Sequence, residues 1–397
     1  TLDRSSAASD VYKRQTLPCP INHPFSLTFK KGSGLRPELS SFLGGMRVDQ
    51  YFMEKAIQVA QAGQGQTFTN PLVGAVIVYQ GTIVAAGCHL QYGKPHAEVN
   101  ALQNCPDEVL AEATMYVTLE PCSHQGKQPP CSQAIIQSGI KQVVIGQLDP
   151  NPLVVAGRGQ AMLRENGLEV ESGVLEAECK QLNPFYNFFH QNKRPFITLK
   201  QASSLDGKIS LQGLRTPITG PEVYQYVRRE RKNYQSILVG SQTAIIDDPA
   251  LHTSPMGPYP PLRIVLDRRG RLKDYDQLQL FHDKDQEVWI FSESNPPTSL
   301  PDHCRWIVQE KVTIESLVDY LSQEGVQSLY VEGGARIHDA FIKEGLWDAF
   351  INYLAPKIIA GNGLPAMSSD RMSQELLDLK DVKVQQIGQD IRISGRR

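Results

Sequence analysis

Residues 118–131 read Thr118-Leu119-Glu120-Pro121-Cys122-Ser123-His124-Gln125-Gly126-Lys127-Gln128-Pro129-Pro130-Cys131. The apolar run before Pro121 predicts a strand over residues 114–119, and a second apolar pattern predicts a helix from Cys131 to Gln137. Upstream, Pro95-His96-Ala97-Glu98-Val99 stands at the start of another predicted helix, which runs from His96 to Leu102. A helix start aims His96 and Glu98 into one pocket, and Cys122 and Cys131 bound the loop that faces it.

These residue types predict a zinc centre. One imidazole and two thiolates (His96, Cys122 and Cys131) make three protein ligands and leave the fourth tetrahedral position to water. Zinc lowers the pKa of such a water from about 15.7 to about 7. Glu98 lies outside the ligand set and can carry the proton from this water to a ring nitrogen and a departing amine. The pattern therefore predicts a hydrolytic deaminase with Glu98 as its catalytic residue.

Two features leave an alternative open at this point. Zinc deaminases of nucleobases commonly carry Pro-Cys-x-x-Cys, whereas the two cysteines here are nine residues apart. A closed structural zinc site would need a fourth protein ligand, and His124 is the candidate.

The chain of 397 residues is long enough for two domains. Strand and helix patterns alternate in both halves, which predicts sheets covered by helices, and a polar segment with a proline, residues 191–195, separates the halves. We expect an α/β/α sandwich over residues 46–193 and a second α/β domain over 194–397. Residues 1–45 lack apolar periodicity and are expected to be a non-native or disordered tail, with Met46 as the native start.

Overall charge and cysteine content narrow the function classes. A net charge of −2 provides no basic footprint for nucleic acid, and the longest apolar stretch near the amino terminus, Leu72 to Val78, is too short to span a bilayer. Seven cysteines at irregular spacing indicate a reducing compartment, so we expect a cytoplasmic protein. Enzymes of this size are often symmetric assemblies, so a homo-oligomer is expected.

The motifs of the first half resemble those of the bifunctional riboflavin-biosynthesis deaminase/reductase family. The resemblance covers residues 118–131, Asn70-Pro71-Leu72-Val73-Gly74 and residues 95–99, and that family has the long spacing between the cysteines. It implies a cytidine-deaminase-like fold, zinc on the three predicted ligands and Glu98 as proton shuttle. It also implies that Asn70 binds the pyrimidine and that Lys127, on a loop over the substrate, binds phosphate. A solvated Lys127 is the alternative.

The second half lacks a Gly-x-Gly-x-x-Gly motif after its first strand. Glu332-Gly333-Gly334-Ala335 instead joins a predicted strand to a predicted helix, where paired glycines let a backbone approach phosphate. Four blocks of the second half resemble the same family: residues 199–208, 218–221, 239–243 and 247–251.

That resemblance implies a dihydrofolate-reductase-like fold and NADPH-dependent reduction of a ribosyl phosphate to a ribityl phosphate. By the same resemblance, Arg231 would bind the substrate phosphate, and Leu251 and Glu332 would line the substrate site. The residues implied for the cofactor are Ala202, Thr243, Asp247, Gly333, Gly334 and Ala335. The alternative is that the basic residues around Arg231, residues 228–232, form a helix face exposed to solvent and bind no phosphate.

Some positions depart from the family pattern. The family commonly has a Ser and a Trp near residues 213–217, where this chain has Arg215 and Pro217, and it frequently has an Arg where Ser254 stands. Arg215 can replace a lost phosphate contact, but Pro217 cannot replace an aromatic surface. Arg268 and Arg269 follow a predicted strand and are candidates to pair with the 2′-phosphate of NADPH.

The sequence thus predicts a two-step enzyme that acts on a small pyrimidine ribosylamino phosphate with zinc and NADPH, and not on nucleic acid or membranes. Two rival functions are a nucleic-acid deaminase that acts on a flipped base and a non-catalytic metal-binding or assembly protein. The near-neutral charge disfavours the first rival, and the intact zinc motif disfavours the second for the first half.

Overall fold

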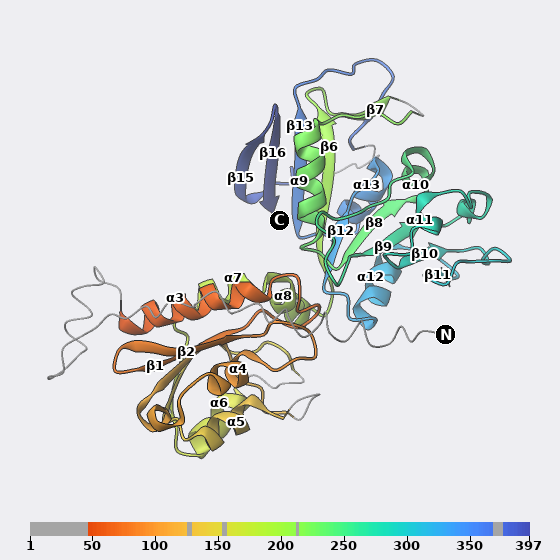
Figure 1. Cartoon of the computed structure of the whole chain (residues 1–397). Helices are drawn as coiled ribbons and strands as arrows, with labels where there is room; N and C mark the ends of the chain where they lie inside the picture. Colours follow the sequence, from red (N-terminus) through yellow and green to blue (C-terminus); the bar gives the residue numbers. More distant parts are fainter. Residues whose placement is uncertain (1–46, 125–128, 153–156, 212–213, 368–375) are drawn as a thin grey trace, which may run out of the picture. The chain divides into compact units, whose positions relative to one another are not determined.

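The computed structural model describes residues 47–124, 129–152, 157–211, 214–367 and 376–397 (Figure 1). The expected tail, Met46 and Lys127 lie outside the described residues. The chain divides into two compact units, one up to Asn187 and one from Phe188. Helix α8 (Pro184–Asn192) runs through this division.

A five-stranded sheet forms the centre of the first unit. Its order is β2-β1-β3-β4-β5, in which β1 is antiparallel to both β2 and β3, while β3, β4 and β5 are parallel. The strands are β1 (Gly74–Tyr79), β2 (Thr82–Cys88), β3 (Thr114–Leu119), β4 (Gln142–Gln147) and β5 (Glu169–Ser172). β1 and β2 form an antiparallel hairpin around Gln80-Gly81.

Helices cover both faces of this sheet, which confirms the predicted α/β/α sandwich. One core contains residues of α4 (Ala97–Gln103), α5 (Cys131–Ser138) and α6 (Arg158–Glu165). The opposite core contains residues of α3 (Val48–Ala60) and α7 (Glu176–Leu182). Short 3₁₀ helices, Gln61–Gly63 and Asp107–Glu112, complete the unit. Figure 1 shows α3 and α7 on one side of the strands and α4, α5 and α6 on the other.

Gly87 in β2 determines how closely α4 approaches the sheet. A Cβ atom at this position would lie 2.3 Å from the backbone nitrogen of Ala101 and 2.4 Å from the carbonyl oxygen of Ala97. Only a residue without a side chain fits between strand and helix here. Because α4 begins directly after His96, this close packing also places the histidine relative to the sheet.

A nine-stranded sheet forms the second unit. Its order is β11-β10-β9-β8-β12-β6-β13-β16-β15, with parallel pairing from β11 to β13 and antiparallel pairing for the last two strands. The strands are β6 (Phe196–Ser204), β8 (Ser236–Gly240), β9 (Leu262–Leu266), β10 (Val288–Ser292), β11 (Cys304–Val308), β12 (Ser328–Val331), β13 (Ala349–Ala355), β15 (Lys380–Ile387) and β16 (Asp390–Arg396). A separate two-stranded sheet pairs β7 (Lys208–Leu211) with β14 (Gly363–Pro365).

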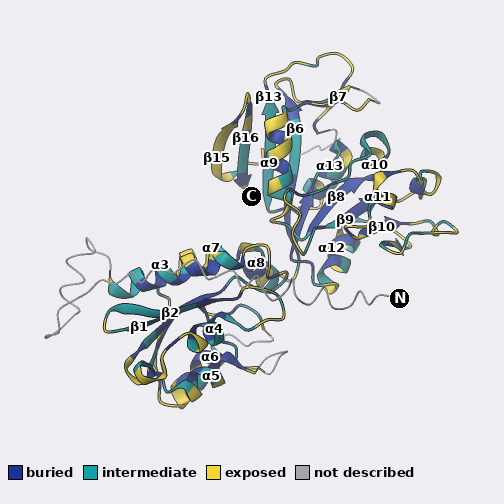
Figure 2. Cartoon of the chain, viewed as in Figure 1, coloured by how far each residue is buried: buried dark blue, intermediate teal, exposed yellow. Residues whose placement is uncertain are grey.

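This sheet also has a core on each face. One core contains residues of α12 (Ile314–Gln323) and α13 (Ala335–Lys343). The other contains residues of α9 (Pro221–Arg231), α10 (Ser241–Asp247), the 3₁₀ helix Arg271–Asp274 and α11 (Gln279–His282). The central strands β8, β10 and β12 are buried along their whole length (Figure 2). The parallel sheet is therefore covered on both sides, as its continuous apolar strands predict.

Among the helices that the structure describes, none combines the length and the apolar character needed to cross a membrane.

Candidate active sites

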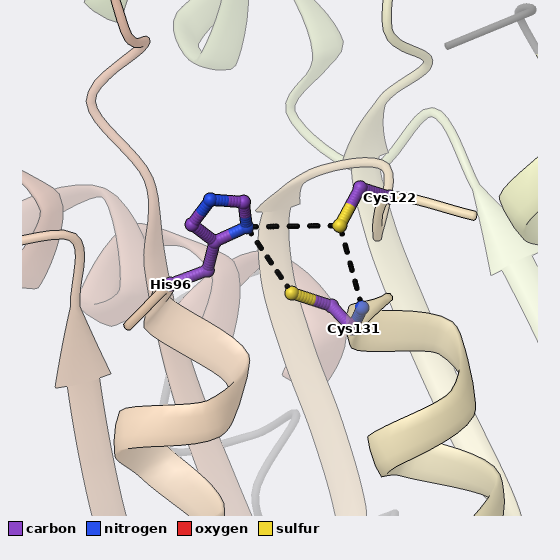
Figure 3. A group of neighbouring side chains, drawn as sticks. All are labelled: His96, Cys122 and Cys131. Atoms are coloured by element: carbon purple, nitrogen blue, oxygen red, sulfur yellow. Dashed lines mark hydrogen bonds between the residues drawn. The ribbon is translucent and has the colours of Figure 1, made fainter. Parts of the chain in front are cut away.

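The three predicted zinc ligands converge from three elements of the first unit. His96 is the N-cap residue of α4, Cys122 follows the end of β3, and Cys131 is the first residue of α5. Figure 3 shows the three side chains directed toward one another. Parallel β3 and β4 direct their carboxyl ends to one edge of the sheet, so the segment after β3 reaches the amino-terminal end of α5.

The distances between these side chains match a metal centre. Nδ1 of His96 lies 3.3 Å from Sγ of Cys131 and 3.7 Å from Sγ of Cys122, and the ligand atoms of all three residues lie within 4.8 Å of one another. Tetrahedral zinc with ordinary Zn–N and Zn–S bond lengths separates a nitrogen and a sulfur ligand by roughly 3.6 Å. The two observed separations lie on either side of this value, so the donor set fits zinc.

The electrostatics of the cluster favour a thiolate on Cys122. The side chain of Cys131 is the main cause that lowers the pKa of Cys122, and His96 and the backbone amide of Cys131 contribute as well. That amide, in the first turn of α5, donates a hydrogen bond to Sγ of Cys122 at 3.3 Å. The interaction with Cys122 also raises the pKa of His96. A thiolate is the form that binds a metal ion.

Glu98 has the properties of a proton carrier. Its side chain is only 3% exposed, and burial raises its pKa to about 7, although His96 opposes this shift. A carboxyl group that titrates near neutral pH can both accept and release a proton during turnover. Glu98 lies in the first turn of α4, two residues beyond the ligand His96.

His124 does not join the cluster. Within the described part of the chain, the metal-ligating group that includes His96 consists of three residues, and His124 is an exposed residue outside it. The arrangement favours the three-ligand centre over the closed structural site. A cavity of about 470 Å³ lies beside His96 and Cys131 and is also lined by Pro95, Val99 and Pro129. A cavity of this size suits a small-molecule ligand.

Asn70 is held by a residue that the sequence analysis missed. Nδ2 of Asn70 lies 3.1 Å from Nε2 of His89, and Nδ1 of His89 lies 3.2 Å from the carbonyl oxygen of Pro95. The rings of His89 and His96 meet edge to face, with centroids 5.2 Å apart. His89 thus connects the residue implied for pyrimidine binding with the segment that leads to the first zinc ligand. Its position directly after an apolar strand was the only signal in the sequence.

Two further missed residues hold the segment around Cys122. Ser132 binds the carbonyl oxygen of Cys122 through both its hydroxyl, at 2.9 Å, and its backbone amide, at 3.1 Å. The buried carboxylate of Glu120 accepts hydrogen bonds from the amides of Asp149, Gly157 and Gln160. Both interactions anchor the chain on either side of Cys122.

In the second unit, two of the three residues implied for the substrate site, Arg231 and Glu332, form an ion pair. The carboxylate of Glu332 accepts hydrogen bonds from Nε and Nη2 of Arg231 and lies 3.2 Å from Nζ of Lys200. Nη1 of Arg231 donates to the carbonyl oxygen of His252, the neighbour of the buried Leu251. Burial opposes ionisation of Glu332, but Arg231 and Lys200 outweigh it and lower its pKa to about 2.

The residues implied for the cofactor gather at the carboxyl ends of neighbouring strands. Gly333 follows β12, and its carbonyl oxygen accepts a hydrogen bond from the amide of Gly240, the last residue of β8. Gly334 faces Thr243, because a Cβ atom on Gly334 would lie 3.6 Å from Oγ1 of Thr243. Ala335 begins α13 and Asp247 ends α10, while Ala202 lies in β6. Ligands of open α/β sheets bind at this end of the strands.

Gly333 has a conformation that other residues rarely adopt. Its φ is +92°, and a Cβ atom would lie 2.9 Å from the ring of His338. Nε2 of the buried His338 donates a hydrogen bond to the carbonyl oxygen of Val331, 3.2 Å away, and so supports the turn. The glycine is therefore required by the backbone and by close packing.

The positions that depart from the family pattern also have defined surroundings. Arg215 is exposed and interacts electrostatically with Asp247. The amide of Ser254 donates to the carbonyl oxygen of Arg228 at 3.1 Å. Arg268 lies 3.1 Å from Glu293, and its side chain is 64% exposed.

Comparison with known protein families defines the class of each unit. The family model described as "Cytidine and deoxycytidylate deaminase zinc-binding region" matches residues 46–147, and the model described as "RibD C-terminal domain" matches residues 195–393. The fold and the zinc centre thus define a zinc-dependent deaminase joined to a reductase.

Whole-chain relatives make this class specific. Riboflavin biosynthesis protein RibD of Bacillus amyloliquefaciens is 38% identical over 360 residues, which cover 88% of this chain and 96% of the relative. RibD of Escherichia coli K12 is 33% identical over 86% of this chain and 98% of the relative. The chain belongs to the family of bifunctional riboflavin-biosynthesis deaminase/reductases. It uses zinc in its deaminase half and NADPH in its reductase half.

Solved structures agree with this assignment. Acinetobacter baumannii RibD has a TM-score of 0.81 and 34% identity, over 88% of this chain and 99% of that chain. A Thermotoga maritima protein described as a diaminohydroxyphosphoribosylaminopyrimidine deaminase/5-amino-6-(5-phosphoribosylamino)uracil reductase has a TM-score of 0.79 and 35% identity, over 88% and 98% of the two chains.

Proposed function

We propose that the deaminase half removes the ring amine of 2,5-diamino-6-(ribosylamino)-4(3H)-pyrimidinone 5′-phosphate. When bound to His96, Cys122 and Cys131, zinc supplies a Lewis acid that lowers the pKa of water. Glu98 takes a proton from the attacking water and delivers it to the ring nitrogen as the carbon–oxygen bond forms. It then carries the second proton to the amine, the carbon–nitrogen bond breaks and ammonia leaves.

The grouping of three zinc ligands beside a buried carboxyl group that titrates near pH 7 carries this proposal. Asn70, oriented by His89, binds the pyrimidine edge. Lys127 binds the phosphate of the deaminase substrate, as its place in the motif implies.

The reductase half then reduces the ribosyl group of the deaminated product to a ribityl chain. Hydride from NADPH adds to the carbonyl carbon of the opened sugar, and a proton completes the alcohol. Arg231, Leu251 and Glu332 contact the substrate; their clustering supports this assignment. The cofactor is bound by Ala202, Thr243, Asp247, Gly333, Gly334 and Ala335. Orientation of the two reactants supplies much of the rate.

The experiment follows the two activities of the purified protein separately. Wild-type protein is given the diaminopyrimidinone substrate, and ammonia release and NADPH oxidation are recorded. We expect Glu98→Gln to slow ammonia release by about 10²- to 10⁴-fold, because the proton carrier is lost. The same variant should oxidise NADPH at the normal rate when it receives the deaminated intermediate. Undiminished ammonia release in this variant would overturn the role of Glu98.

We also propose functional domains over residues 46–193 and 194–397, and a cytoplasmic location. The six cysteines among the described residues form no disulfide with one another, which supports a reducing compartment. A homo-oligomer is proposed as well. The valines Val382 and Val384 are 53% and 68% exposed on β15, the last strand of the nine-stranded sheet, and support contact with another copy. Sedimentation of the purified protein tests this assembly.

A further inference from the structure

Two arginines of α9 lie against one short segment beside the reductase site. Arg228 and Arg231 are three residues apart and therefore share a face of the helix. Nη1 of Arg231 donates to the carbonyl oxygen of His252 at 3.0 Å, and Nη2 of Arg228 lies 3.4 Å from the carbonyl oxygen of Thr253. The amide of Ser254 closes the contact by donating to the carbonyl oxygen of Arg228. Both guanidinium groups thus border the segment that follows Leu251.

The charges of the two arginines are balanced differently. Arg231 is neutralised by both carboxylate oxygens of Glu332, and its three nitrogens all donate to protein oxygens. Among the residues that the structure describes, no carboxylate pairs with Arg228, and its buried Nε has no hydrogen-bond partner. Its Cζ atom lies 5.8 Å from the centroid of the Tyr224 ring. A half-buried cation without a counter-charge is unfavourable unless an anion binds to it.

The reductase substrate carries such an anion, because the name of the Thermotoga maritima relative specifies a phosphoribosylamino compound. Ser254 stands where the resembling family frequently has an Arg, and a hydroxyl group cannot supply its charge. Arg215, the other candidate for this contact, interacts electrostatically with Asp247 at the end of α10, on the side implied for the cofactor. Arg228 is the cation that lies directly beside Ser254.

We infer that Arg228 binds the 5′-phosphate of the reductase substrate, next to the Arg231–Glu332 pair. The inference rests on the proposed reductase function and adds a specificity-determining residue to it. The guanidinium supplies the positive charge and the N–H donors that phosphate oxygens accept. Arg231, already paired, keeps Glu332 in position and adds its charge to the same region.

The test compares two reductase substrates that differ only in the phosphate. NADPH oxidation is measured with the deaminated ribosylamino phosphate and with the corresponding dephosphorylated nucleoside. We expect Arg228→Met to lower kcat/KM for the phosphorylated substrate about 10- to 100-fold, mainly through KM. The nucleoside should lose less than about 2-fold, and inorganic phosphate should inhibit the variant more weakly than the wild type. Arg228→Lys should recover a substantial part of the preference for phosphate.

Arg229→Met is the matched control, because Arg229 is the adjacent arginine of α9 and is exposed. It should keep the preference for the phosphorylated substrate. Reduction of the dephosphorylated nucleoside at close to the wild-type rate confirms that the reductase unit of each variant is folded. An equal loss on both substrates for Arg228→Met, or a Lys variant without any recovery, would show that Arg228 only holds the Thr253 backbone. A wild-type protein that reduces neither substrate would instead refute the proposed function itself.

Discussion

Nδ2 of Asn70 lies 3.1 Å from Nε2 of His89, at a distance of 19 positions in the sequence. The buried His89 also reaches the carbonyl oxygen of Pro95, directly before the ligand His96. The residue proposed to bind the pyrimidine and the first zinc ligand therefore share one support. In metal sites, partners of this kind orient the groups that contact the metal or substrate.

This relationship predicts the effect of His89→Phe. The aromatic ring still packs against His96, but Asn70 loses a hydrogen-bond partner, so kcat/KM for deamination should fall about 10-fold. Zinc content, measured by atomic absorption, should stay at the wild-type level. Asn104→Ala is the control, because the exposed side-chain amide of Asn104 lies 3.4 Å from the carbonyl oxygen of Ala86, away from His89 and Asn70 in the hydrogen bonds of the described residues. Loss of zinc from His89→Phe would contradict a role confined to Asn70.

Removal of zinc should separate the two activities. Treatment with a chelator should abolish ammonia release, because the three ligands belong to the first unit alone. NADPH oxidation with the deaminated intermediate should continue, and added zinc should restore deamination. Ammonia release that survives exhaustive chelation would refute the metal centre as the site of the reaction.

The burial of His338 should make the stability of the reductase unit depend on pH. Burial lowers its pKa from 6.5 to about 4, so the folded state disfavours the protonated ring. Its stabilising contribution is complete above pH 6.5 and is lost as the pH falls toward 4, where the folded state must bury a charge. The full change amounts to about 3 kcal/mol.

Urea unfolding between pH 4 and pH 8 measures this contribution. The stability of the wild type should fall more steeply below pH 6.5 than that of His338→Gln, which has no ring to protonate. Altered packing against Gly333 changes the stability of the Gln variant equally at every pH, so the comparison uses the slope of the unfolding free energy against pH. Parallel slopes for the two proteins would exclude His338 as the titrating group.

We expect Arg268 and Arg269 to give the reductase its preference for NADPH over NADH. Arg268 is largely exposed after β9, and only Glu293 is paired with it among the described residues, so its guanidinium is accessible to a phosphate. Replacing both arginines by alanine should lower the ratio of kcat/KM for NADPH to that for NADH at least about 10-fold. Arg305→Ala, on β11, is the control, since Arg305 pairs with Glu324. An unchanged ratio in the double variant would refute the 2′-phosphate contact.

Local sequence patterns determined the zinc ligands and the central strands. His96, Cys122 and Cys131 are recognisable because each stands at the start of a helix or the end of a strand, and these boundaries are visible in the apolar pattern. β9 (Leu262–Leu266) and β12 (Ser328–Val331) fall on stretches of the sequence that are mainly apolar. Both strands are buried on two faces and therefore appear as continuous apolar runs.

Strands without such a pattern were missed. All but the last of the eight residues of β15 are exposed, and the strand is held by backbone pairing with β16. The short strands β7 and β14 likewise pair across about 150 intervening residues. Their stability comes from a partner strand that is distant in the sequence, which leaves no local hydrophobic signal.

The sequence by itself determined what kinds of chemistry this protein can perform, because metal ligands, an acid and phosphate-binding turns are properties of residue types and short spacings. Only the tertiary structure decided which residues meet: Asn70 with His89, Arg231 with Glu332, and Arg228 with no carboxylate among the described residues. Such pairs depend on strand order and register across the sheet, and on which charges remain after all others are matched. These are properties of the assembled fold, and no single segment contains them.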